Sequence, residues 1–177
     1  MLYRTIVADP PWDVAAGPRS LHDPNEQSRP LTYATMNVYQ IAALPVQHLA
    51  ERDAHLYLWT INAYVESAYW IARAWGFTPA TLLVWAKAPK GRGLGGTFST
   101  ATEYVLFARR GSLAAKDRVD RNWWQWQRRE HSEKPEAFID LVEQVSPGPY
   151  VELFARRHRL GWDVWGDQSA NTASLAV

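Results

Sequence analysis

The sequence predicts a single α/β domain with a mostly parallel sheet and helices on both faces. Short apolar runs typical of strands alternate with segments of helical periodicity, which is the pattern of a parallel sheet. The length of 177 residues fits one ordinary domain. Ligands of such sheets bind at the carboxyl ends of the strands, so residues that follow a strand are the first candidates for a site.

Six apolar runs, most of them bounded by turn residues, predict strands. They are residues 3–8, 55–59, 81–85, 104–107, 150–154 and 163–165. The first run ends abruptly at Pro10-Pro11, because proline has no N–H to give to a sheet ladder.

Three segments with apolar side chains near a period of 3.6 residues predict helices. They are residues 37–51, 65–75 and 135–145. Pro45 interrupts the first, Gly76 stops the second, and Pro135 begins the third. We expect the folded domain to cover residues 1–168, and residues 169–177 to form a flexible tail.

Composition excludes several classes of function. The chain has no cysteine, which excludes disulfides, thiol catalysis and cysteine-ligated zinc, and we expect no metal site. No apolar run approaches the length of a membrane span, and no leader segment begins the chain, so a cytoplasmic protein is expected. The net charge of +1 favours no class of partner by itself, although basic residues gather in short clusters.

Three connections, over residues 13–36, 86–101 and 111–133, are too long to be plain loops. We expect them to leave the same edge of the sheet and to build a cleft there. The last contains Trp123-Trp124-Gln125-Trp126, flanked by Arg121, Arg128 and Arg129. Aromatic and arginine side chains in alternation suit single-stranded nucleic acid, and a loop folded over the core is an equal alternative.

Residues 91–96, Gly-Arg-Gly-Leu-Gly-Gly, match a dinucleotide-binding pattern, but another strand follows them instead of a helix. No helix N-terminus is therefore expected to hold a pyrophosphate. A glycine-rich loop that carries Lys90 and Arg92 is the better interpretation, and it either closes over a substrate backbone or forms a hairpin end.

The turn Asp9-Pro10-Pro11-Trp12 is the strongest candidate for chemistry. Each proline ring fixes its φ, so the turn is stiff and presents a carboxylate, backbone carbonyls without paired neighbours, and an indole face. Such a turn suits a planar substrate with an exocyclic NH2 group. A strand end with a capping aspartate and a core tryptophan is the alternative.

Further candidates follow other predicted strands and precede the last helix. A cation at Lys134, beside Ser132 and a helix N-terminus, suits a carboxylate. Residues 152–156, Glu-Leu-Phe-Ala-Arg, end a strand, and Arg156 and His158 suit ribose hydroxyls or a carboxylate. Gly166-Asp167-Gln168 offers acceptors and donors for an adenine edge.

Together these segments resemble the MT-A70 family of S-adenosylmethionine-dependent adenine N6-methyltransferases. The matching residues lie in the family's order from residue 4 to residue 168: Asp9-Pro10-Pro11-Trp12, Tyr33, Leu56-Tyr57-Leu58-Trp59, Ser132-x-Lys134-Pro135, Ser146-Pro147-Gly148, Glu152-Leu153-Phe154-Ala155-Arg156-x-His158 and Gly166-Asp167-Gln168. The resemblance implies a Rossmann-like methyltransferase fold whose catalytic motif precedes the main cofactor-binding strand.

The resemblance also implies a role for each matching position. Asp9 and the Pro10 carbonyl would hold the target amine, with Pro11 stiffening the turn and Trp12 stacking on the base. The implied substrate contacts are Tyr33 and Trp59, beside Lys87 and Arg92 from the basic loop. The implied cofactor contacts are Asp9, Ser132, Lys134, Glu152, Leu153, Phe154, Arg156, His158, Asp167 and Gln168.

The chain departs from the family pattern at two places. We expect the acidic cofactor contact that eukaryotic members carry well before the Asp-Pro-Pro-Trp turn to be missing or replaced here, and Asp167 stands where asparagine is frequent. We expect methyl transfer to unpaired adenine, in DNA before RNA, by a monomer or a dimer. A non-catalytic partner subunit, cytosine N4 methylation and a small-molecule methyltransferase remain alternatives.

Overall fold

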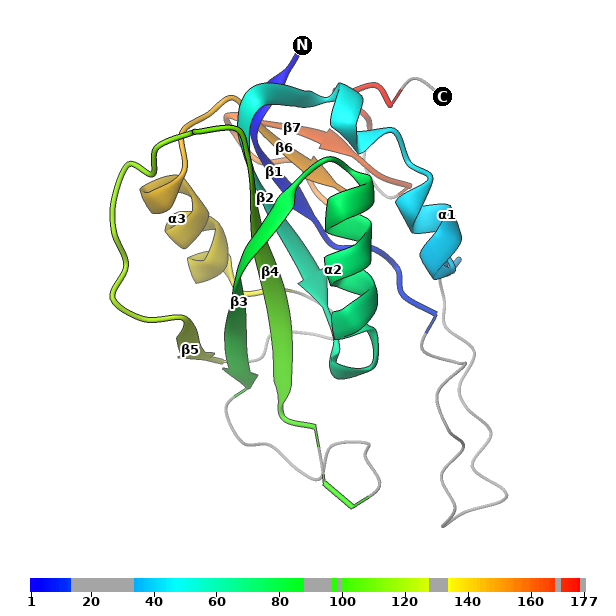
Figure 1. The fold of residues 1–177 in the computed structure, drawn as a ribbon, viewed down its shortest axis with the longest axis vertical. Helices are drawn as coiled ribbons and strands as arrows, with labels where there is room; N and C mark the ends of the chain where they lie inside the picture. Colours follow the sequence, from blue (N-terminus) through cyan, green and yellow to red (C-terminus); the bar gives the residue numbers. More distant parts are fainter. Residues whose placement is uncertain (14–33, 88–96, 99, 128–133, 168–169, 176–177) are drawn as a thin grey trace.

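The computed structural model describes residues 1–13, 34–87, 97–98, 100–127, 134–167 and 170–175 (Figure 1). Seven strands form one sheet in the order β5-β3-β4-β2-β1-β6-β7. Their bounds are β1 Tyr3–Ala8, β2 Ala50–Thr60, β3 Thr78–Lys87, β4 Thr102–Arg110, β5 Trp123–Trp126, β6 Tyr150–Leu153 and β7 Trp162–Trp165. Only β4 runs antiparallel to its neighbours, β2 and β3, so the prediction of a mostly parallel sheet is confirmed.

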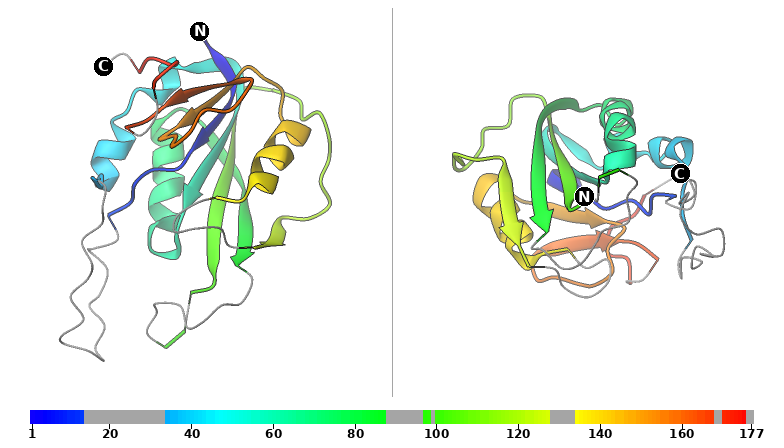
Figure 2. Two further views of the ribbon diagram at one scale, coloured as in Figure 1. Left: turned by 180° about the vertical axis from the view of Figure 1, so that it is seen from behind. Right: turned by 90° about the horizontal axis from the view of Figure 1, so that it is seen from below.

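Helices cover both faces of the sheet, as expected. Helices α1 (Val38–Ala42) and α2 (Val65–Ala74) lie on one face, and α3 (Glu136–Val145) lies on the other (Figures 1 and 2). Alternate residues of β2 serve the two layers, because successive side chains of a strand point to opposite faces. Leu56 and Leu58 pack with the α2 side, whereas Tyr57 and Trp59 pack with the α3 side.

The helix expected over residues 37–51 is wrong in its length. Helix α1 ends at Ala42, a 3₁₀ turn η2 (Val46–His48) follows, and β2 already begins at Ala50. Asn37 starts α1 with a capping box to Gln40. Pro45 lacks the N–H that a continuing helix would need, so the apolar residues beyond it serve a turn and a strand instead.

Two segments expected to lack regular structure or to fray are ordered by the sheet. Residues 123–126 form β5, an edge strand parallel to β3, and the indole N–H of Trp85 donates to the Trp126 carbonyl at 3.0 Å. Near the end of the chain, the backbone N–H groups of Thr172 and Ala173 donate to the Val164 carbonyl. Ala173 is buried in the core, so this part of the expected tail packs against β7.

A buried polar chain ties β2 to the end of α3 and to the connection after β4. The His55 Nε2 atom lies 3.1 Å from the Leu113 carbonyl, and Nδ1 lies 2.8 Å from the Ser146 hydroxyl. Since a carbonyl only accepts, Nε2 carries the proton and Nδ1 accepts from Ser146, whose oxygen accepts from the Tyr57 hydroxyl at 2.8 Å. Burial lowers the pKa of His55 and keeps the ring neutral.

The free energy of unfolding should therefore depend on pH through His55. The unfolded chain binds a proton near the ordinary pKa of 6.5 and the folded chain only at lower pH. The contribution of His55 is complete above pH 6.5 and is lost as pH falls. The free energy of unfolding, measured with urea at several pH values, should rise less steeply with pH in His55→Gln than in the native chain. His48→Gln, at an exposed position, is the control, and equal slopes in all three proteins would contradict the assignment.

Candidate active site

The turn after β1 is held by backbone hydrogen bonds on both sides. The N–H of Asp9 donates to the Leu153 carbonyl at 3.3 Å, which joins the turn to the end of β6. The Pro10 carbonyl accepts from the N–H of Trp12, and the Pro11 carbonyl accepts from the N–H of Met36, both at 2.9 Å. The expectation that these carbonyls lack partners is wrong, although each carbonyl oxygen has a second lone pair.

Trp12 anchors the turn in the core. Its ring is 5% exposed and stacks on Tyr64 with a centroid distance of 5.0 Å, and its indole N–H donates to the Trp59 carbonyl at 3.1 Å. Little of this side chain is exposed, and the stacking of Trp12 on the substrate base stays a prediction. Truncation of such a buried ring lowers the free energy of unfolding by about 3–5 kcal/mol. Because Trp12 ends the turn that begins at Asp9, its packing also supports the position of Asp9.

Lys134 brings two carboxylates together at the edge of the sheet. Its Nζ atom lies 3.1 Å from Asp9 Oδ1 and 3.2 Å from Glu103 Oε2. Asp9 follows β1, and Glu103 is the second residue of β4. Because β4 is antiparallel, it begins at the edge where β1 and β2 end, so both carboxylates reach the one ammonium group.

The ion pairs keep this cluster charged despite its burial. Burial would lower the pKa of Lys134, but the Asp9 and Glu103 carboxylates raise it above its ordinary value. Burial would likewise raise the pKa of Glu103, and Lys134 with Lys87 lowers it below its ordinary value. The Lys134 ammonium also lies 4.9 Å from the centroid of the Trp59 ring.

Glu103 is the site residue that sequence reasoning missed. It forms ion pairs with Lys87 and Lys134, and it is only 17% exposed at its side chain. No motif marks it, because it lies alone at the start of a strand. Its place is predictable only once β4 is known to be antiparallel, since a parallel β4 would put Glu103 at the opposite edge.

Glu152 adds a further carboxylate on the same face. It pairs in register with Val7 of β1, so its side chain points to the face that Asp9 also shares. Burial raises the pKa of Glu152 to about 7, and the negative charge of Asp9 raises it as well. A cationic ligand at this edge would relieve the repulsion between the two carboxylates.

Glu136 fastens the segment after β6 to the start of α3. It forms ion pairs with Arg157 and Arg159, and these guanidinium groups hold the pKa of Glu136 below its usual range despite its partial burial. Phe154, where the segment leaves the strand, has a φ of 65°. Gly166 packs directly against the backbone of Ala155. An added Cβ would stand 2.5 Å from the Ala155 carbonyl oxygen, so only glycine fits there.

Three predicted site residues do not present their side chains to a ligand as expected. Trp59 is 2% exposed and forms the floor beneath Lys134. Leu153 is fully buried and contributes its backbone carbonyl to the turn. Phe154 is half-buried and packs edge-on against Trp165 at 5.5 Å.

The remaining predicted residues divide into two groups. Arg156, His158 and Asp167 are exposed near the ends of β6 and β7, and their roles stay predictions. Tyr33, Arg92, Ser132 and Gln168 lie outside the described residues, as does the glycine-rich segment 91–96.

The described part of the chain contains no group of three histidine, aspartate or glutamate side chains placed to hold a metal ion. Within the same residues, no helix combines the length and the apolar character needed to cross a membrane.

Comparison with known proteins gives a family. The family model named MT-A70 matches residues 3–168. The Type II methyltransferase M.MunI of Mycoplasma sp. is 32% identical over 180 residues, which cover 93% of this chain and 76% of that protein. The N(6)-adenosine-methyltransferase MT-A70-like protein of Drosophila melanogaster is 27% identical, and the catalytic subunit METTL3 of Homo sapiens is 24% identical.

Coverage differs between these relatives. The match takes in 94% of this chain in both eukaryotic cases, but only 27% of the Drosophila protein and 28% of the human one. The chain thus spans about a quarter of the length of the eukaryotic relatives, and most of the bacterial one. Since the family model extends over nearly every residue from β1 to the end of β7, the chain belongs to the MT-A70 family of methyltransferases.

Proposed function

We propose that this chain transfers a methyl group from S-adenosylmethionine to the N6 amine of an unpaired adenine in nucleic acid. The observation that carries the proposal is the Asp9 carboxylate, which stands at the end of β1 on a rigid turn and is oriented by Lys134 at 3.1 Å. The relatives named for methyl transfer to N(6)-adenosine support adenine as the base.

The described residues fit S-adenosylmethionine. Lys134 carries three donor hydrogens, and Asp9 and Glu103 account for two of them, so a third suits the carboxylate of the ligand. The crowded carboxylates of Asp9 and Glu152 suit its positive charges and its ribose hydroxyls. When bound, the sulfonium supplies an activated methyl group, which makes a metal ion unnecessary.

Asp9 and Pro10 act on the nucleophile. The N6 lone pair of adenine is delocalised into the ring, so the amine attacks weakly. Hydrogen bonds from the two N6 hydrogens to the free Asp9 oxygen and to the second lone pair of the Pro10 carbonyl would pull the nitrogen toward a pyramidal geometry. The nitrogen would gain the methyl carbon as the carbon–sulfur bond of the sulfonium breaks and a neutral thioether leaves, and one N6 proton would pass to Asp9 and on to water. Positioning and electrostatics supply most of the acceleration.

We take DNA as the first polymer to test, and the Type II methyltransferase M.MunI, at 32% identity and with 76% of its length covered, supports this choice. RNA is the alternative, supported by the relatives named for N(6)-adenosine. The base must leave its stack to reach the turn, which favours single-stranded or unpaired adenine.

The purified chain should label single-stranded DNA in preference to duplex DNA when it is incubated with isotopically labelled S-adenosylmethionine. Matched single- and double-stranded RNA form the comparison. Mass spectrometry of the digested nucleosides should find N6-methyladenine. Exclusive N4-methylcytosine, or no labelled polymer in any of the four cases, would overturn the proposal.

Asp9→Asn removes the negative charge that draws the N6 hydrogens and the group that takes the N6 proton, so it should lower kcat by about 10²–10³-fold, the usual cost of losing one group that stabilises a transition state. Asp140→Asn, at an exposed position on α3, is the matched control and should keep native activity. Thermal unfolding should show that both variants fold. Near-native turnover of Asp9→Asn would exclude the proposed mechanism.

Glu103→Gln should change how activity depends on pH. Loss of this carboxylate lowers the pKa of Lys134, since Glu103 is one of the two groups that raise it. The alkaline limb of the kcat profile should therefore move to lower pH, with a fall in kcat of about tenfold at neutral pH. Glu66→Gln, on the exposed start of α2, should leave the profile unchanged. A Glu103→Gln profile equal to the native one would show that Glu103 has only a structural role.

A further inference from the structure

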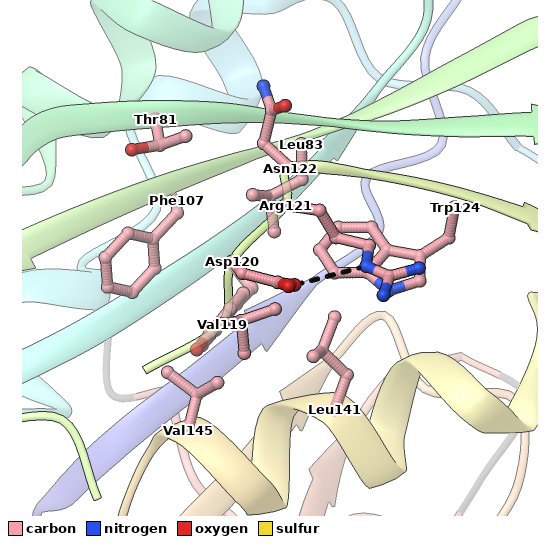
Figure 3. A pocket seen from close by; sticks show the side chains of 11 residues that line it. Thr81, Leu83, Phe107, Val119, Asp120, Arg121, Asn122, Trp124, Leu141 and Val145 are labelled. Carbon is pink, nitrogen blue, oxygen red and sulfur yellow. Dashed lines mark hydrogen bonds and ion pairs between the residues drawn. The ribbon is translucent and has the colours of Figure 1, made fainter. Parts of the chain in front are cut away.

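A cavity of about 380 Å³ lies on the α3 face of the sheet, away from the Asp9 turn (Figure 3). This volume falls within the range of ligand pockets, about 300–1,000 Å³. The floor is apolar, with Leu83 and Phe107 from the sheet and Leu141 and Val145 from α3. Nothing in the proposed chemistry at Asp9 uses this cavity.

Strand β5 connects the cavity to the candidate active site. In the β3–β5 register, Trp126 pairs with Lys87, which is the ion-pair partner of Glu103. Trp124 lies two residues before Trp126 and lines the cavity, so about 7 Å of strand separates the two positions. The side chain of Trp126 therefore lies between the cavity and the ion pair of Lys87 with Glu103.

The side chains of Trp124 and Trp126 stack on each other along β5. The rings of Trp124 and Trp126 lie 5.4 Å apart at an interplanar angle of 14°. The indole of Trp85 fixes the backbone of Trp126 by its hydrogen bond at 3.0 Å. Because Trp124 has one ring neighbour in Trp126 and also lines the cavity, a planar group inside the cavity can continue the stack.

Polar groups stand at the rim. Arg121 and Asp120 form an ion pair of 3.3 Å between side chains that are 58% and 86% exposed. An exposed pair of this kind contributes little stability, so the guanidinium can exchange its partner for a phosphate. Asn122 donates to the Leu82 carbonyl at 3.1 Å, and its amide oxygen remains an acceptor suited to the edge of a base.

We propose that this cavity binds a base of the same single strand whose adenine lies at Asp9, with the base stacked on Trp124 and the adjoining phosphate paired with Arg121. The inference rests on the proposed function and extends it to a second contact with the substrate. A stacked aromatic surface beside a cation is the arrangement that holds single-stranded nucleic acid without sequence preference. The continuity of β5 with the Lys87 edge favours the substrate strand over other occupants.

Adjacent tryptophans on β5 provide the test. Trp124→Ala should raise the dissociation constant of a fluorescein-labelled single-stranded oligodeoxynucleotide, measured by anisotropy, by roughly tenfold, as expected for the loss of one stacked base. KM for the same strand should rise in parallel while kcat stays unchanged. Trp123→Ala is the matched control, because Trp123 is 57% exposed, does not line the cavity, and should keep both values within twofold.

A second pair of variants separates binding from folding. Trp124→Phe keeps an aromatic ring and should restore most of the affinity. Thr81→Trp fills the cavity from an exposed position of β3 and leaves the Trp124–Trp126 stack in place, so it should weaken binding as Trp124→Ala does. A native chain that methylates no polymer would refute the proposed function. Normal methylation with equal affinities in Trp124→Ala, Trp123→Ala and Thr81→Trp would refute the cavity proposal alone.

Length of the substrate gives an independent readout. The native chain should bind a longer strand more tightly than the shortest strand it methylates, and Thr81→Trp should abolish most of this difference. If Thr81→Trp weakens the binding of free adenosine monophosphate but leaves oligonucleotide affinity unchanged, the cavity is a site for a small nucleotide, and the proposal is wrong.

Discussion

The site depends on one ammonium group. Lys134 lies at the entrance to α3 and holds Asp9 and Glu103 at hydrogen-bonding distance, above the ring of Trp59. These side chains are partly buried, so the loss of one partner leaves the charges of the others poorly compensated. The position of Asp9 is therefore set by the packing of α3 against the sheet as much as by its own turn.

The sheet explains how distant parts of the chain meet at this ammonium group. Strand β1 delivers Asp9 and the neighbouring β6 delivers Glu152, because parallel strands end at the same edge. The antiparallel β4 starts at that edge and delivers Glu103. The Glu136 ion pairs then join the segment after β6 to the helix that follows Lys134. A single edge thus brings three carboxylates near one another, and two of them, Asp9 and Glu103, form ion pairs with Lys134.

The tryptophans have different tasks that their sequence context does not reveal. Trp12 and Trp59 are in motifs that suggest contact with substrate, yet both are buried and support charged residues above or beside them. Trp124 and Trp126 lie in a polar stretch that suggested a loop, yet they form an edge strand whose stacked rings reach a cavity. An aromatic ring is available to a ligand only where the tertiary packing leaves a face open.

The sequence by itself determined the α/β class, most of the strands and the end of β1 just before Asp9 and the two prolines, and it gave Asp9 and Lys134 as candidates for the site. These depend on local rules: hydrophobic period, the missing N–H of proline, and the residue types that follow strands. The tertiary structure decided the direction of β4, the burial of Trp12, and the meeting of Glu103 with Lys134. Strand direction and burial depend on contacts between residues far apart in the chain, which no local pattern records.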